Sequence, residues 1–204
     1  MLTLYHLRNS RSDRILWLLE ELGLDYEIVR YDRDPTFRAP AAMRAVHELG
    51  KSPILRDGDL VIAESGAIVD YVVTRHGNGR LAPRHGDPAW ARYVFWLHFS
   101  EGSLMPWLTM DFLLTSGMVP GVDPGPLGQS LKQELARYLH WVDNDLEGRA
   151  FAAGNEFSAA DVMLAYALEF AKGRNHLADT RHLLPYLERM TSRAAYQRAK
   201  DKAA

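Results

Sequence analysis

Three serine hydroxyls lie where they can bind or stabilise an anion. Ser10 follows a short apolar run, Leu2–Leu7, and directly precedes a helix-like pattern, and Ser65 begins another such pattern after a second apolar run. Backbone N–H groups at a helix start favour negative charge, and a serine hydroxyl can donate one more hydrogen bond. Ser12 is the alternative to Ser10, although its simpler interpretation is the N-cap of that helix. The spacing therefore predicts anion stabilisation by hydroxyl groups.

The chain of 204 residues contains no cysteine. This excludes disulfides, thiolate metal sites, Cys-x-x-Cys redox chemistry and any mechanism that needs a thiol of the enzyme. If the chemistry uses a thiol, the substrate must bring it. The eight histidines are scattered, without a His-Glu-x-x-His arrangement, and no glycine-rich phosphate loop is present. We therefore expect no metal and no nucleotide cofactor.

The composition is that of a globular protein with no special electrostatic partner. Hydrophobic residues make up 47% and charged residues 25%, and 24 basic against 26 acidic residues give a formal net charge of −2. This balance gives no reason to expect nucleic acid or an anionic membrane as partner. No apolar run approaches the ~20 residues of a membrane span, and the first residues do not resemble a signal peptide. We expect a cytoplasmic protein.

The first part of the chain has the pattern of a mixed sheet flanked by helices. Leu2–Leu7 and Tyr26–Val29 are predicted strands on either side of a helix that Gly23 ends. Two apolar runs around Asp57-Gly58 predict a hairpin. A short helix at 41–46 and a further helix at 66–75 complete the order β-α-β-α-β-β-α.

The second part of the chain is predicted to be helical. Glycine and proline mark a linker at 79–87, which separates a domain at 1–78 from one at 88–204. The spacing of apolar residues predicts one long helix from Trp90 to Leu108. The remaining expectations are a loop at 117–128, a helix over 131–146, a helix opened by the capping box at 158–161, and one last helix over 185–200.

Five local motifs together resemble the cytosolic glutathione S-transferase family, and most closely a serine-type branch found in bacteria and fungi. They are Ser10–Gly23, His47–Pro53, Ala63–Gly66, Glu101–Pro106 and Ser158–Asp161, in the order and spacing of that family. The resemblance implies an α+β thioredoxin-like N-terminal domain that binds glutathione, followed by an all-α C-terminal domain. It also implies a homodimer in which the first domain of one subunit faces the second domain of the other.

Glutathione carries a thiol, which must become a thiolate to act as a nucleophile. The catalytic serine of the serine-type branch stands four positions before an arginine, as Ser10 stands before Arg14. The resemblance therefore implies that Ser10 donates a hydrogen bond to the thiolate. Ser12 is the rival donor, and Tyr5 is a less favoured tyrosine-type donor because it falls inside the first strand.

The glutathione-binding residues implied by the resemblance are Ser10, Lys51, Ser52, Pro53, Glu64 and Ser65. A cis Pro53 would present the backbone of Ser52 to the cysteinyl part of glutathione. Lys51 would pair with the glycyl carboxylate, for which Arg38 is a weaker candidate.

Glu64 and Ser65 resemble the Glu-Ser turn of the family, which binds the γ-glutamyl end of glutathione. Ser65 would receive the carboxylate through its hydroxyl and backbone N–H at a helix start, and Glu64 would accept from the ammonium group. Simple capping of the helix by Ser65 is compatible with this role.

The electrophile is expected in an apolar cleft between the two lobes, lined by the long helix. Its candidate contacts are Tyr93, Trp96, Phe99, Ser103 and Trp107, although an aromatic stripe is also typical of a core or an interface. Glu101 lies on the apolar face of that helix, so we expect a buried or interface carboxylate with a polar partner.

The sequence as a whole predicts a glutathione transferase, in which the thiolate attacks a soft electrophilic carbon and gives a thioether. One alternative is a glutathione-dependent peroxidase that uses the same site to attack an O–O bond. Another is a non-catalytic binding module on the same fold. The identity of the physiological electrophile is left open at this point.

Overall fold

The described residues form two compact units. The computed structural model describes residues 1–118, 121 and 123–204. The sheet unit comprises Met1–His85 together with Thr191–Ala204, and the helical unit comprises Gly86–Met190. The domain limits of 1–78 and 88–204, with the linker at 79–87, stay predictions. The contacts within the chain divide it after His85 and group its last helix with the sheet unit.

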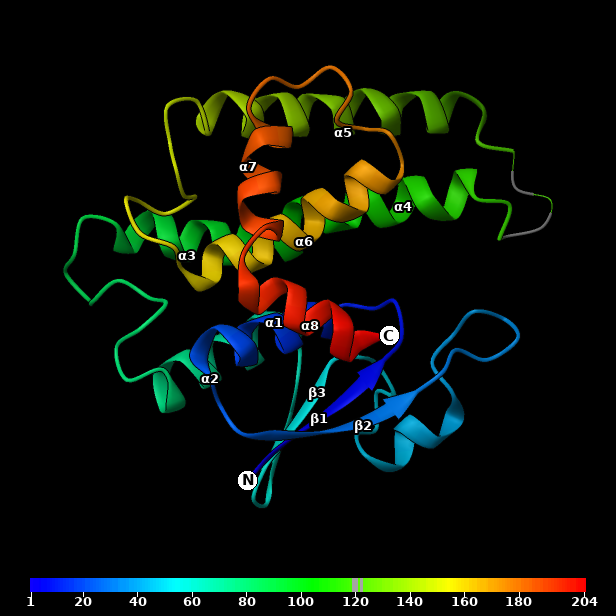
Figure 1. The fold of residues 1–204 in the computed structure, drawn as a ribbon. Helices are drawn as coiled ribbons and strands as arrows, with labels where there is room; N and C mark the ends of the chain where they lie inside the picture. Colours follow the sequence, from blue (N-terminus) through cyan, green and yellow to red (C-terminus); the bar gives the residue numbers. More distant parts are fainter. Residues whose placement is uncertain (119–120, 122) are drawn as a thin grey trace. The chain divides into compact units, whose positions relative to one another are not determined.

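The sheet unit is built on a four-stranded mixed sheet (Figure 1). Its elements are β1 (Leu2–Leu7), α1 (Ser12–Leu22), β2 (Tyr26–Tyr31), the 3-10 helix η1 (Ala41–Ala45), β3 (Ile54–Asp57), β4 (Leu60–Ala63), α2 (Ser65–His76) and α8 (Ala194–Ala203). The strand order is β2-β1-β3-β4, with β1 parallel to β2 and antiparallel to β3. This arrangement confirms the predicted fold class.

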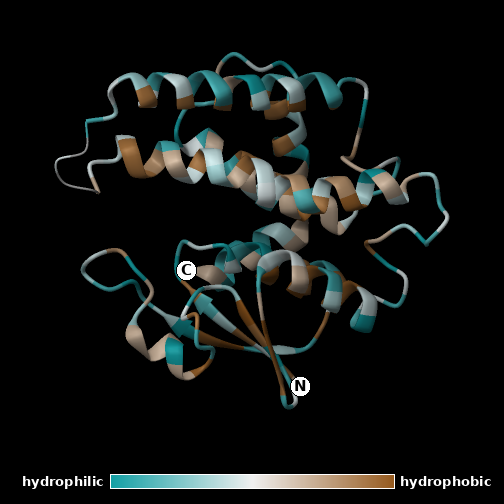
Figure 2. Cartoon of the chain, turned by 180° about the vertical axis from the view of Figure 1, so that it is seen from behind, coloured by the Kyte–Doolittle hydropathy of each residue, from teal (hydrophilic) through white to brown (hydrophobic). Residues whose placement is uncertain are grey.

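The central strand β1 is covered on both faces. Every residue of β1 except Thr3 is buried, as expected for a strand between two layers. Figure 1 shows α1, α2 and α8 over one face of the sheet. On the other face, Tyr5 and Leu7 pack in a core cluster with Met43 of η1 and Ile54. The apolar residues concentrate along the middle strands, as Figure 2 shows.

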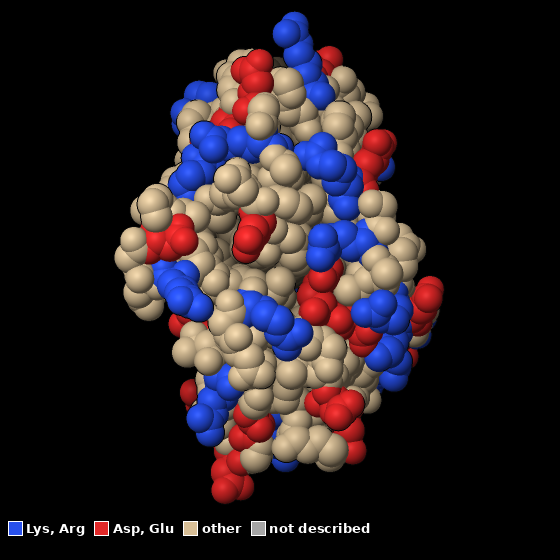
Figure 3. Space-filling model, turned by 60° about the vertical axis from the view of Figure 1, so that its left-hand side comes forward, with Lys and Arg blue, Asp and Glu red and all other residues tan. Residues whose placement is uncertain are grey.

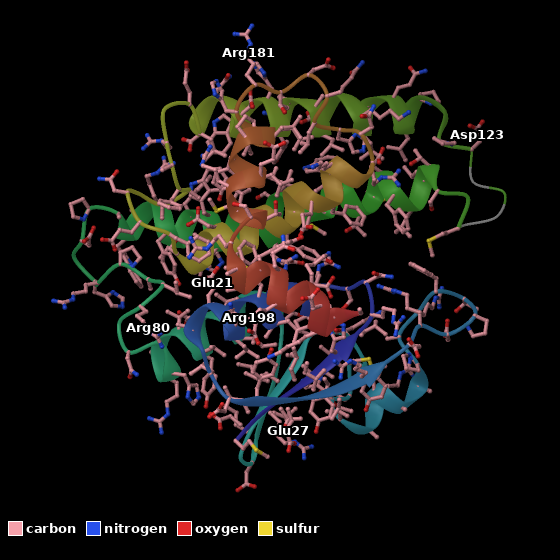
Figure 4. All side chains as sticks on the ribbon, viewed as in Figure 1. Glu21, Glu27, Arg80, Asp123, Arg181 and Arg198 are labelled. Atoms are coloured by element: carbon pink, nitrogen blue, oxygen red, sulfur yellow. The ribbon has the colours of Figure 1, made fainter. Side chains whose placement is uncertain are left out.

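Helix α1 ends as predicted and is held against α8 by charged and aromatic contacts. Gly23 adopts the left-handed conformation, with φ of 61°, and its N–H donates to the Glu20 carbonyl, which is the usual helix-ending use of glycine. Arg193 makes two hydrogen bonds to Glu21, at 2.6 and 2.9 Å. Arg198 donates to Glu20 at 2.8 Å. Figure 4 labels Glu21 and Arg198 at this helix pair.

The helical unit contains α3 (Trp90–Phe99), a π turn η2 (Ser100–Leu104), α4 (Met105–Thr115), α5 (Gly125–Asp145), α6 (Ala159–Gly173) and α7 (Leu183–Thr191). The predicted long helix is present but contains the π turn. Pro106 follows this turn and has no N–H to donate to the preceding helical turn, so the wider hydrogen-bonding pattern accommodates it.

Two predicted boundaries are wrong. Helix α5 begins at Gly125, so 125–128 is helical rather than loop; residues 119, 120 and 122 of that predicted loop lie outside the described residues. The expected single helix at 185–200 is two helices, because the chain is extended at Arg193, with ψ of 136°. No glycine or proline marks this break. Instead, the Gln197 side chain donates to the Thr191 carbonyl at 2.7 Å and Arg193 binds Glu21.

Ser158 and Asp161 form the predicted capping box at the start of α6. Asp161 is fully buried. Its carboxylate accepts hydrogen bonds from the N–H groups of Ala152 and Ser158, at 2.7 and 2.8 Å, and from the Tyr186 hydroxyl at 2.7 Å. One side chain thus joins α6, α7 and the loop that precedes α6.

The surface charge is mixed on the face drawn in Figure 3. Acidic and basic side chains are interspersed over the face seen in Figure 3. Within the part of the chain that the structure describes, no helix has both the length and the apolar character needed to cross a bilayer.

We predict that Asp161→Ala lowers the free energy of unfolding by about 3 kcal/mol or more, because two buried N–H groups lose their acceptor and each loss costs about 1–3 kcal/mol. Urea denaturation measures the change. Tyr186→Phe is the control; it removes a single hydrogen bond and should cost about 1 kcal/mol. Equal losses in the two variants would contradict the central role of the carboxylate.

We predict that Glu20 makes stability acid-sensitive. Burial alone raises its pKa, but hydrogen bonds from Lys202, Tyr26 and Arg198 outweigh burial and lower the pKa from 4.5 to about 2. A lowered pKa in the folded state means stability that is present above the ordinary pKa and lost as pH falls toward the lowered one.

The measurement is urea denaturation of wild type and Glu20→Gln at several pH values between neutral and about 3. The stability difference between the two proteins should shrink as pH falls below about 4.5. Glu27→Gln, at an exposed position of β2, is the control and should follow wild type. A difference independent of pH would contradict the proposed stabilisation of the Glu20 carboxylate.

Candidate functional site

A chain of short hydrogen bonds runs through the turn between β1 and α1. The Ser10 Oγ lies 2.9 Å from the Ser12 Oγ and 2.9 Å from the Ser52 Oγ. The Ser12 Oγ in turn lies 2.8 Å from Nδ1 of His6. The structure therefore brings the predicted residues Ser10 and Ser52 into direct side-chain contact, and it adds His6, which the sequence did not single out.

Ser10 is placed at the start of α1 by backbone hydrogen bonds. Its carbonyl accepts from the Asp13 N–H at 3.0 Å, and its Oγ accepts from the Ser12 N–H at 3.2 Å. Ser10 is 8% exposed. A hydroxyl held against the first N–H groups of a helix lies in a positive local potential, which favours an anion beside it.

Ser12 is not the N-cap of α1, and this expectation is wrong. Ser12 is the first residue of the helix, and its side chain turns back toward β1. There the Ser12 Oγ accepts from the Leu7 N–H at 3.3 Å and contacts His6. With no exposed surface, Ser12 lies behind Ser10. Tyr5 lies in the core cluster with Met43 and Ile54. The Cζ atom of Arg56 lies 5.5 Å from the centroid of the Tyr5 ring.

Ser52 and Pro53 lie just before β3. The Ser52–Pro53 peptide bond is cis, as the sequence predicted. The Ser52 side chain is half-buried and directed to Ser10, a contact that sequence reasoning missed because it considered only the backbone of Ser52. Lys51 and Arg38 are both exposed, so each has a solvated cation available for a carboxylate.

Glu64 and Ser65 form the turn between β4 and α2. Ser65 is the first residue of α2 and is 2% exposed, yet its hydroxyl has no hydrogen-bond partner among the described residues. Buried hydroxyls are almost always paired, so an orphaned one at a helix start is suited to an external acceptor. Glu64 is exposed and has a positive φ of 75°, with ψ of 125°. Such strain in a residue other than glycine is typical of functional sites.

The five residues expected to contact the electrophile differ in their burial. Tyr93 and Trp96 are 1% and 0% exposed and belong to the core of the helical unit, so they have almost no surface for a ligand. Phe99, Ser103 and Trp107 are half-buried and keep some surface. Phe99 stacks on Tyr138 of α5, with ring centroids 5.9 Å apart.

Glu101 lies in the π turn and is half-buried. The expectation of a buried or interface carboxylate with a polar partner stays a prediction. In the described part of the chain, no three metal-ligating side chains come together.

The sequence indicated only weakly that His6 is buried and needs a polar partner. It shares a face of β1 with Leu2 and Leu4, which are buried, so a polar side chain there needs a buried partner. The sequence did not reveal the partners themselves. They are Ser12 and the carbonyl of Ala203, the latter 3.3 Å from Nε2 at the far end of the chain.

Comparison with known proteins gives the family. Residues 1–74 match the profile of the glutathione S-transferase N-terminal domain, and residues 126–198 match that of the glutathione S-transferase C-terminal domain. The chain belongs to the glutathione S-transferase family. It is a glutathione-dependent transferase with glutathione as its co-substrate.

Relatives match this transferase over most of their length. Glutathione S-transferase 3 of Schizosaccharomyces pombe is 38% identical over 87% of this chain and 77% of its own. Glutathione S-transferase GstB of Escherichia coli is 38% identical over 81% of this chain and 80% of its own. A solved glutathione S-transferase from Actinobacillus pleuropneumoniae is 36% identical, with a TM-score of 0.89, over 100% of this chain and 93% of its own.

We predict that Glu64→Gly separates stability from ligand binding in this transferase. Glycine relieves a strained backbone that costs about 1–3 kcal/mol but loosens the unfolded chain by about 0.5–1 kcal/mol. The unfolding free energy should therefore stay unchanged or rise by up to about 2 kcal/mol. If Glu64 binds the ammonium group of glutathione, as the sequence predicts, glutathione affinity should fall about tenfold or more, because a charged hydrogen bond is worth about 1.5–3 kcal/mol.

Thermal unfolding and isothermal titration measure the two effects. Asn78→Gly is the matched control, since Asn78 also has a positive φ, of 51°, but lies outside the candidate site. Asparagine tolerates this conformation, so the control should change neither property. Unchanged glutathione affinity in Glu64→Gly would remove Glu64 from the site.

Proposed function

We propose that this glutathione transferase is of the serine type and that Ser10 is its catalytic residue. The observation that carries the proposal is the position of the Ser10 Oγ, at the N-terminus of α1 and 2.9 Å from Ser52 beside the cis-proline. In the proposed reaction the glutathione thiol loses its proton. The sulfur electron pair then forms a bond to a soft electrophilic carbon, the leaving group departs with its own electron pair, and a thioether results.

The energy that Ser10 must supply is within reach of one hydrogen bond. A free thiol has a pKa near 8.5, and lowering it by about two units requires about 2.7 kcal/mol. A hydrogen bond to a charged acceptor supplies about 1.5–3 kcal/mol. The N-terminus of α1 adds a favourable potential of about 0.3–1 kcal/mol.

Glutathione recognition is proposed to use both ends of the tripeptide. The unpartnered Ser65 hydroxyl and the N-terminus of α2 bind the γ-glutamyl carboxylate, while Glu64 binds the ammonium group. The backbone of Ser52 pairs with the cysteinyl part. At the other end, Lys51 binds the glycyl carboxylate, and Arg38 is the weaker candidate for this role.

For the electrophile, we propose contact with the half-buried side chains of Phe99, Ser103 and Trp107. The two aromatic rings suit a flat or apolar group, and Ser103 offers one hydroxyl. Tyr93 and Trp96 then act from behind, as core residues that fix the helix carrying these contacts.

A homodimer and a cytoplasmic location, both implied by the family resemblance, complete the proposal. The exposed aromatic side chains Phe95 and Trp141, each 43% exposed and in edge contact with one another, are compatible with an interface on α3 and α5. Sedimentation equilibrium of the purified chain tests the dimer, and a monomer at micromolar concentration would contradict it.

We predict that Ser10→Ala raises the pKa of the bound glutathione thiol by about two units, because the hydrogen bond to the thiolate is lost. Ultraviolet absorbance of the thiolate against pH measures this, and isothermal titration shows that glutathione still binds. Ser130→Ala, at an exposed position of α5, is the control and should titrate like wild type.

Turnover of an aryl halide and of cumene hydroperoxide by the same proteins separates transferase from peroxidase activity. Both activities should fall in Ser10→Ala, because both need the thiolate. If the bound thiol has the same pKa in Ser10→Ala as in wild type, the hydrogen-bond donor to the thiolate is Ser12 or Tyr5. A wild type that does not bind glutathione would indicate a binding module without transferase activity.

A further inference from the structure

The hydrogen-bond chain behind Ser10 has a direction, and His6 sets it. Nε2 of His6 lies 3.3 Å from the carbonyl oxygen of Ala203. A carbonyl only accepts hydrogen bonds, so Nε2 carries the proton of the neutral imidazole and Nδ1 is the acceptor. The Ser12 Oγ lies 2.8 Å from Nδ1 and 3.3 Å from the Leu7 carbonyl oxygen, so its single proton is donated over the shorter contact, to His6.

The remaining hydroxyl protons follow from counting donors and acceptors. Each serine hydroxyl has one proton to donate and two lone pairs to accept. Because Ser12 donates to His6, its contact with Ser10 requires Ser10 to donate to Ser12. The Ser10 Oγ then accepts from the Ser12 N–H and from the Ser52 hydroxyl. With neutral His6, the hydroxyl protons of Ser52, Ser10 and Ser12 all point along the hydrogen bonds toward His6.

This direction conflicts with the role of Ser10 in the proposed function. A hydroxyl that donates to Ser12 has no second proton for a thiolate. When His6 is protonated, however, Nδ1–H donates to the Ser12 Oγ and the Ser12 hydroxyl turns to the Ser10 Oγ. Only then is the Ser10 proton available to a sulfur anion.

We propose that His6 is a positioning residue that receives, through Ser12 and Ser10, the proton released by the glutathione thiol. The inference rests on the proposed function of Ser10. The Ser52 hydroxyl turns away from the Ser10 Oγ, and the thiol donates to the lone pair that this frees. The S–H bond breaks, its electron pair stays on sulfur, and its proton bonds to the Ser10 Oγ. The former Ser10 proton moves to the Ser12 Oγ, and the former Ser12 proton moves to Nδ1 of His6. A neutral thiol and a neutral imidazole become a thiolate and an imidazolium.

The transfer leaves the Ser10 and Ser12 hydroxyls reversed, which resolves the conflict. The Ser10 hydroxyl now donates to the thiolate, Ser12 donates to Ser10, and the imidazolium donates to Ser12 and to the Ala203 carbonyl. One proton movement thus forms the nucleophile and turns Ser10 toward it. No solvent base is required, which suits a relay whose inner members, Ser12 and His6, are 0% and 1% exposed.

The groups around His6 act on its pKa in both directions, and their net effect favours the neutral imidazole at rest. Burial, together with Arg30 of the neighbouring β2 strand and Arg8, lowers the pKa of His6, whereas the hydrogen bond to Ala203 at the end of α8 raises it. The Asp13 carboxylate of α1, 3.8 Å from Nδ1, faces the same ring and favours the imidazolium. A thiolate beside Ser10 adds a second negative charge.

The first test uses the wild-type protein labelled with ¹⁵N-histidine near neutral pH. On saturation with glutathione, the Nδ1 resonance of His6 is expected to shift from the unprotonated to the protonated position as thiolate absorbance appears. S-methylglutathione is the matched control ligand, because it has the same charged ends but no thiol proton. It should leave Nδ1 of His6 unprotonated.

Calorimetry of glutathione binding in buffers of different ionisation enthalpy counts the protons released. The relay predicts that thiolate forms without a matching release of protons to the buffer. Thiolate formation with an unprotonated His6 and full proton release would overturn the proposal, even though Ser10 would still be the thiolate donor. Absence of glutathione binding, or of any thiolate, would instead contradict the proposed function itself.

The second test is His6→Asn, which keeps an acceptor oxygen near the position of Nδ1 but cannot be protonated. Ser12 then stays turned inward, so the pKa of the bound thiol should rise and the proton released by any remaining thiolate should reach the buffer. His98→Asn, at an exposed position of α3, is the control and should match wild type. A His6→Asn protein with the wild-type thiol pKa and proton count would overturn the proposal, and the labelled wild type decides the matter if this variant does not fold.

Discussion

The buried hydroxyl of Ser12 is the contact on which the site depends. It has no exposed surface, and it joins the end of β1, through the Leu7 N–H and His6, to Ser10 at the start of α1. A buried hydroxyl without partners would cost about 1–3 kcal/mol, so the geometry of the β1–α1 turn is constrained to satisfy all of these bonds at once. The position of Ser10 at the helix N-terminus is a consequence of that constraint, and so is its reach to Ser52.

The last helix of the chain, α8, packs beside the turn between β1 and α1 that carries Ser10. Residues Glu20 and Glu21 of α1 are held by Arg193, Arg198 and Lys202, and the edge contact of Trp17 with Tyr196 adds apolar contact between the helices. These interactions place the Ala203 carbonyl beside His6. Partly buried ion pairs contribute modestly to stability by themselves because desolvation opposes them. Their larger effect here is to hold α8 against α1, where the Ala203 carbonyl meets Nε2 of His6.

The sequence predicted most elements because their signals are local. The Asp57-Gly58 hairpin, the glycine that ends α1 and the capping box of Ser158 and Asp161 each depend on a few neighbouring residues. The errors arose where distant contacts override local preference. The chain breaks at Arg193 to reach Glu21 on another helix, and Ser12 turns from the expected N-cap role toward His6 on β1. Neither position contains a residue that by itself dictates the observed conformation.

The sequence by itself determined the family, the fold class, the absence of an enzyme thiol and the candidate hydroxyls at two helix starts. These follow from residue types and from spacings within a few turns of chain. Only the tertiary structure decided which hydroxyls meet and that His6 lies beside them. The Ser10–Ser52 contact joins residues 42 apart, and the His6–Ala203 contact joins residues 197 apart. Periodicity cannot encode such pairs, because they form only when the sheet and α8 pack together and leave each buried polar atom in need of a partner.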